Sequence, residues 1–108
     1  MSIPIIKTFS LTAAGQVSAS ENITKAINAS FNVRVGAIGT NIVLRAEFSL
    51  DNGITWSNCN TADTIITANS QVIVPVMGNN THPPLVRLNW VSTSGGIPTV
   101  TGVLRMSV

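Results

Sequence analysis

Charged residues are scarce in this chain of 108 residues, where Asp, Glu, Lys and Arg make up 9% of the sequence, against about 25% in an average soluble domain. Ser, Thr and Asn take their place at roughly a third of the chain. This mixture suits strands and turns better than helices. A free monomer usually stays soluble through interspersed charges of both signs. The shortage of charge therefore favours a protein that is packed against others.

The chain also lacks basic clusters, cysteine pairs and long apolar runs. Its six Lys and Arg residues are scattered and give a net charge of only +2, whereas phosphate binding needs clustered cations. Cys59 is alone, which excludes an internal disulfide and a cysteine-based metal site. No apolar run approaches the roughly 20 residues that span a bilayer, and the N-terminus has no signal-peptide pattern. We expect no nucleic-acid or membrane partner and synthesis in a reducing cytoplasm.

Groups that could perform catalysis are equally few. The only histidine, His82, stands in a loop before Pro83 and Pro84, and nothing in the sequence supplies it with a nucleophile and an orienting group. The four carboxylates are Glu21, Glu47, Asp51 and Asp63. They form no pattern of paired acids or convergent metal ligands. We therefore expect a protein that is not an enzyme, without catalytic residues, cofactor or metal.

Short strand-like runs separated by turn residues fill the sequence. The candidate strands are Ile5–Leu11, Ala29–Ile38, Ile42–Leu50, Ile54–Ser57, Thr64–Thr67, Gln71–Met77, Leu85–Ser92 and Thr99–Val108. The predicted turns between them include Gly39-Thr40-Asn41, Gly78-Asn79-Asn80 and Ser94-Gly95-Gly96. About eight short strands at this spacing predict one all-β domain over residues 1–108, an antiparallel sandwich of jelly-roll or immunoglobulin-like kind. Residues 1–10 are either an N-terminal arm or the first strand.

Alternation along the strands predicts their inner and outer faces. In the predicted strand Ile42–Leu50, every second residue up to Leu50 points inward. In four of the strands the outward face carries a single Arg. Several aliphatic residues also fall on the outward side, either because they meet other subunits or because the strand registers are misassigned. The residues expected at an assembly interface are Val43, Arg45, Arg87, Val91, Val103 and Arg105. Pro75 removes a ladder donor and predicts an edge strand, and Gly102 predicts a bulge or a close approach.

The octet Ser49-Leu50-Asp51-Asn52-Gly53-Ile54-Thr55-Trp56 predicts a hairpin. Gly53 accepts a positive φ, and Asp51 and Asn52 hydrogen-bond their own backbone and tolerate the left-handed region. The octet resembles the Asp-box of sialidases and related β-propellers, where it is a repeated structural hairpin. One copy in a short chain implies a hairpin and no sialidase activity. Asp51 is therefore expected to shape the turn.

Residues 29–108 also resemble small β-sandwich virion proteins of tailed bacteriophages, such as capsid decoration and head- or tail-associated proteins. The resemblance lies in the strand that ends in the Asp51 hairpin, in Leu85–Trp90 and in the terminal strand Thr99–Val108. It implies a virion protein that binds capsid or tail subunits as a homo-oligomer, such as a trimer, and stabilises the particle. No catalytic residue comes with it.

The alternative is a carbohydrate-binding module, which would recognise host glycans if it is phage-borne. Trp56 is its possible ligand residue, since an exposed indole offers a stacking surface for sugars. An exposed Trp56 beside polar loop residues would favour glycan binding, whereas a packed Trp56 would favour a scaffold. A small enzyme is the third possibility and would require His82 in a pocket beside a hydroxyl, thiol or carboxylate.

Overall fold

A computed structural model describes residues 4–24, 26, 28–60, 62–76 and 85–107. Within them the chain forms strands and no helix, so no helix there is long and apolar enough to cross a membrane. The strands are β1 (Pro4–Leu11), β2 (Glu21–Asn22), β3 (Asn28–Ser49), β4 (Ser57–Asn58), β5 (Thr64–Ile66), β6 (Ser70–Pro75) and β7 (Leu85–Ser107). The predicted turn at Gly78-Asn79-Asn80 and His82 lie outside the described residues.

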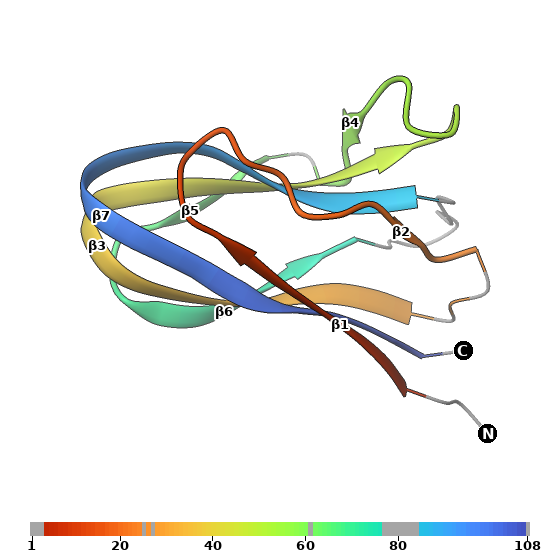
Figure 1. Cartoon of the computed structure of the whole chain (residues 1–108), viewed down its shortest axis with the longest axis horizontal. Coiled ribbons are helices and arrows are strands. Elements are labelled where there is room, and N and C mark those ends of the chain that lie inside the picture. The colour runs from red at the N-terminus through yellow and green to blue at the C-terminus, as the bar shows by residue number, and fades with distance from the viewer. Residues whose placement is uncertain (1–3, 25, 27, 61, 77–84, 108) are drawn as a thin grey trace.

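All the strands belong to one antiparallel sheet that curls into two facing layers (Figure 1). In the first layer the strand order is β1, the C-terminal half of β7, the N-terminal half of β3, and β6. In the second layer it is β2, the N-terminal half of β7, the C-terminal half of β3, and then β5 and β4. This order is that of a jelly roll. The all-β sandwich expected from the sequence is confirmed, with jelly-roll pairing and not immunoglobulin-like pairing.

The strands β3 and β7 pass from one layer to the other without a break, at the left of Figure 1. They contain 22 and 23 residues, so the predicted turns at Gly39-Thr40-Asn41 and Ser94-Gly95-Gly96 are wrong. Register shifts on both sides of Ile38 bend the paired strands, as β-bulges do. Ala37, Gly95 and Gly96 adopt positive φ at this bend. A Cβ on Gly39 would run into the backbone of Gly95 and Gly96. The two bent strands therefore approach so closely here that only glycine fits.

The core lies between the layers and is built from the inward residues of both. Phe31, Val33 and Leu104 come from the first layer, and Leu44, Leu88 and Trp90 from the second. Phe9 packs edge-on against Phe31 with ring centroids 5.9 Å apart, a favourable aromatic geometry. One continuous cluster of this kind is what holds two sheets face to face.

Two details of the predicted strands change, one open alternative is decided, and one expectation is confirmed. Leu50, expected inside, is 74% exposed, because the alternation ends at Ser49 where the hairpin loop begins. The predicted strand Ile54–Ser57 is replaced by the two-residue β4, since the hairpin bonds occupy the preceding residues. Residues 4–11 form the strand β1 paired with β7 and are not a free arm. Within the described residues β6 pairs with β3 alone, which confirms the edge expected from Pro75.

Gly102→Ala is expected to lower the free energy of unfolding by about 2–3 kcal/mol. Its Cβ would run into the backbone carbonyl oxygen of Asn32 in β3, a close approach that the sequence predicted. Gly36→Ala is the matched control in the same sheet, because its Cβ would meet only the Thr99 hydroxyl at 3.4 Å. Urea unfolding of both variants measures the difference, and equal losses would contradict the close approach as the cause.

Candidate assembly surfaces

The residues predicted for an interface are divided between the two outer faces of the sandwich. Arg45 of β3 and Arg87 of β7 both lie in the second layer, where Arg45 pairs with Asn89 and Arg87 pairs with Glu47. Val43 and Val91 lie beside a bulge in the same layer, since Val43 pairs with Ser92 and Leu44 with Trp90. Val103 and Arg105 belong to the first layer. The structure thus brings four of the six together and places the other two on the opposite face.

A network of charged side chains covers the outer face of the second layer. Arg45 donates from Nε and Nη2 to both oxygens of Asp63, at 2.8 and 2.9 Å. Arg87 Nε donates to Glu47 Oε1 at 2.8 Å, and Arg45 Nη1 lies 3.8 Å from Glu47 Oε2. The network therefore contains two cations and two carboxylates and has no net charge. The bond from Arg45 holds the pKa of Asp63 below its usual value.

Glu47 is the most enclosed member of this network. Its side chain is 7% exposed, and its second oxygen also accepts from Asn89 Nδ2 at 3.2 Å. Glu47 thus forms a cross-strand ion pair with Arg87, and its carboxylate is buried beneath its partners. A buried charge needs such partners, because burial without them costs several kcal/mol.

Cys59 lies next to this network and is half-buried. Its backbone N–H donates to the carbonyl oxygen of Ala46, and its side chain packs against the core. Burial, and secondarily the charge of Glu47, raises the pKa of the Cys59 thiol to about 12. A thiol with so high a pKa stays protonated at neutral pH and is a poor nucleophile.

Trp56 joins the network through a cation–π contact. The Arg87 guanidinium carbon lies 4.2 Å from the centre of the indole ring, well within the range of such contacts. The indole Nε1–H donates to the carbonyl oxygen of Gly53 at 3.1 Å. The ring is therefore held against the hairpin and covered by Arg87 on one side, while part of it remains exposed.

The Asp51 hairpin is braced from within. Asp51 Oδ1 accepts from the Thr55 backbone N–H and from Ser49 Oγ, both at 2.8 Å. Ser49 Oγ also accepts from Gly53 N, and Asn52 and Gly53 have positive φ as expected. The hydrogen bonds from Thr55, first from its hydroxyl and then from its backbone, lower the pKa of Asp51 to about 2. The role of Asp51 in shaping the turn is confirmed.

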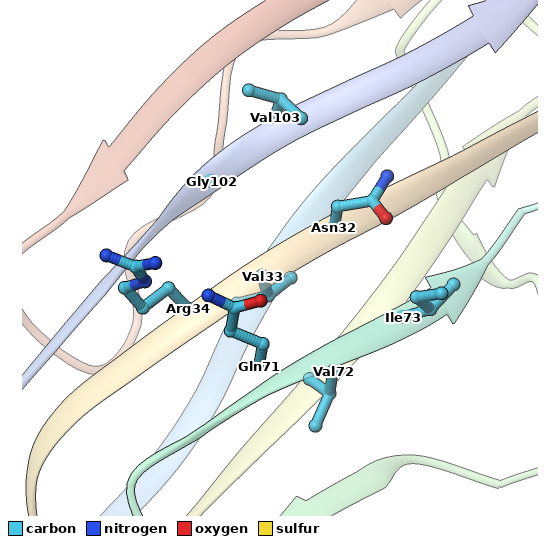
Figure 2. A pocket seen from close by; sticks show the side chains of 8 residues that line it. All are labelled: Asn32, Val33, Arg34, Gln71, Val72, Ile73, Gly102 and Val103. Carbon is cyan, nitrogen blue, oxygen red and sulfur yellow. The ribbon is translucent and has the colours of Figure 1, made fainter.

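The outer face of the first layer has a different character. It carries Arg34 and Arg105, and none of the four carboxylate side chains lies on it, since these belong to β2, to the second layer and to the hairpin. A hollow of about 430 Å³ opens over β3 between β6 and β7. Figure 2 shows Arg34, Gln71, Ile73 and Val103 around it, with no side chain at Gly102. The Gln71 amide, with its oxygen turned toward Arg34, accepts from its guanidinium at 2.6 and 3.2 Å.

Asp63, Asn58 and Asn89 are members of the network that the sequence did not single out. Asp63 reaches Arg45 because Thr64 pairs with Leu44. Asn58 Nδ2 donates to Asp63 Oδ1 at 2.9 Å, because β4 pairs Asn58 with Glu47. Only the pairing of distant strands defines these neighbours. Among the described residues no group of three His, Cys, Asp or Glu side chains is placed to hold a metal ion.

Comparison with known proteins supports the fold. No protein-family model matches the sequence, and no curated protein matches it. A solved structure described as "Bacillus endospore appendages form a novel family of disulfide-linked pili" is similar, with a TM-score of 0.57 and 18% identity. The match covers 99% of this chain and 88% of that chain. At this identity the likeness shows a shared fold.

Glu47→Gln is expected to lower the free energy of unfolding by about 2 kcal/mol, because it removes the charge that Arg87 and Arg45 share. Glu21→Gln is the control, since Glu21 is half-exposed in β2, outside this network. Chemical denaturation at neutral pH measures both. A Glu47→Gln variant as stable as Glu21→Gln would show that the network does not stabilise the second layer.

Acid is expected to weaken the hairpin in a defined pH window. Because the pKa of Asp51 is about 2 in the folded chain and 3.8 is its ordinary value, its stabilisation is complete above pH 3.8 and is lost as pH falls through 2. As the pH falls from 3.8 to 2, the wild type loses this stabilisation, whereas Asp51→Asn has none to lose. The difference in free energy of unfolding between the two proteins should therefore narrow over this range. Denaturation of both proteins across this range tests the shift. A constant difference would mean that the carboxylate titrates normally.

Proposed function

We propose that this chain is a non-enzymatic structural subunit that associates with further copies of itself in a larger assembly. One observation supports this above the others. Among the described residues six large aliphatic side chains are 39–81% exposed: Ile6, Val17, Leu50, Ile54, Ile65 and Ile73. Only ten charged side chains are present in the whole chain to offset them. Such a surface is typical of proteins whose faces are covered by partners.

The positions of these residues support contacts in more than one direction. Ile6 and Ile73 lie in β1 and β6 of the first layer, whereas Leu50 and Ile54 lie on the hairpin that extends from the second layer. Different patches on opposite sides of a subunit are what an extended or ring-shaped assembly requires. The solved structure with the similar fold is described as a pilus, which agrees with a structural role.

The assembly that we propose is a bacteriophage virion, in which the chain decorates the capsid or is associated with the head or tail. This part rests on the resemblance of residues 29–108 to small phage virion proteins. The contacts would be non-covalent, because the single Cys59 is half-buried and its raised pKa keeps the thiol protonated. This differs from the disulfide-linked pili of the similar structure.

Glycan binding at Trp56 is less well supported. A sugar-stacking indole needs an open ring face, and Arg87 occupies one face of Trp56 while Gly53 holds its N–H. Aromatic side chains in this position more often contribute to packing. The assembly proposal accounts for the exposed aliphatic residues, which glycan binding at Trp56 does not.

The wild-type chain is expected to sediment as an oligomer, at a mass that is a multiple of 11.3 kDa. Sedimentation equilibrium over a concentration series measures this mass, and co-purification with phage particles tests the virion setting. A chain that stays monomeric at the highest concentration reached and is absent from particles would contradict the proposed function. An oligomer absent from particles would contradict only the virion setting.

A further inference from the structure

The hollow on the first layer is an open, cationic and partly apolar site. Its volume of about 430 Å³ lies within the range of sites that bind a ligand or a short segment, roughly 300–1,000 Å³. Ile73 at its rim is 66% exposed, and Val103 is half-exposed across from it. Within this hollow Arg34 is hydrogen-bonded to the neutral Gln71 amide, and no carboxylate of the described residues neutralises its charge there. An occupant should therefore present aliphatic side chains and one negative charge.

The tip of the Asp51 hairpin has this composition. Leu50 and Ile54 are 74% and 81% exposed and stand on either side of Asp51 in the sequence. The hydrogen bonds from Ser49 and Thr55 to Asp51 hold the tip in one conformation. A segment that is already ordered loses little conformational entropy when it binds.

The tip and the hollow of one copy belong to different layers. The hairpin extends from the C-terminal end of β3 in the second layer (Figure 1). The hollow lies on the outer face of the first layer, over the N-terminal half of β3. The tip of one copy is therefore available to the hollow of another. A contact between two different patches is heterologous, and its repetition produces rings or filaments.

We propose that the hairpin tip of one copy docks in the hollow of a second copy, with Leu50 and Ile54 covering Ile73 and Val103 and the Asp51 carboxylate facing Arg34. This inference rests on the proposed self-association and adds which surfaces of two copies bind each other. The contact is small, so each interface is weak by itself. The pair of opposite charges makes it sensitive to salt.

Two variants disable the two sides separately. Ile54→Ser removes an aliphatic side chain from the tip and Ile73→Ser removes one from the hollow, and both residues are so exposed that folding is preserved. Each variant alone is expected to lose the oligomers seen for the wild type in sedimentation velocity. An equal mixture is expected to form a dimer and stop there, because one intact tip and one intact hollow remain. Ile65→Ser is the matched control, since Ile65 is 65% exposed in the second layer.

The outcomes separate this mode from the proposed function. A wild type that remains monomeric overturns both. A wild type that associates, while the mixture forms no dimer or Ile65→Ser weakens association as much as Ile73→Ser does, overturns the docking alone. Arg34→Gln gives a second readout: it should reduce the salt sensitivity of association, and an unchanged salt dependence would remove Arg34 from the contact.

Discussion

The antiparallel pairing of β3 with β7 is the interaction on which the rest of this structure depends. It runs from Asn28 opposite Ser107 to Ser49 opposite Leu85 and passes through both layers. Every other strand of the described chain pairs with one of these two. This pair of strands bends at its bulges, where glycines allow the two backbones to approach closely. The bend turns one sheet into a sandwich. Because the pairing fixes the register, it also decides which side chains point outward in each layer.

The two outer faces that result differ in electrostatics. On the second layer Arg45, Glu47, Asp63 and Arg87 pair with one another, so the network on this face has no net charge. On the first layer no carboxylate of the described residues pairs with Arg34 or Arg105, and exposed aliphatic residues adjoin both. The charges on the outer face of the second layer therefore neutralise one another, whereas those on the first layer can pair with charges of another molecule. Such asymmetry suits a subunit whose faces meet different surfaces.

Local patterns predicted the local structure well. The Asp51 hairpin follows from residues within eight positions, because Ser49, Asp51 and Thr55 bond with one another and with their own backbone. The edge position of β6 follows from the missing N–H of Pro75. The glycines at 39, 95 and 96 gave a turn signal as well, but a glycine permits a bend in a paired strand as readily as a turn. Only the partner strand decides between them.

The sequence by itself determined the strand-rich class, the inward and outward sides of most strands and the shape of the hairpin, since these depend on alternation and on contacts between near neighbours. The tertiary structure decided how the outward residues are grouped. It placed Asp63 on Arg45, enclosed Glu47, and separated Arg45 and Arg87 from Val103 and Arg105. The physical reason is that these groupings depend on which distant strands pair, and a register between strands is set by the whole core and the bend of β3 and β7.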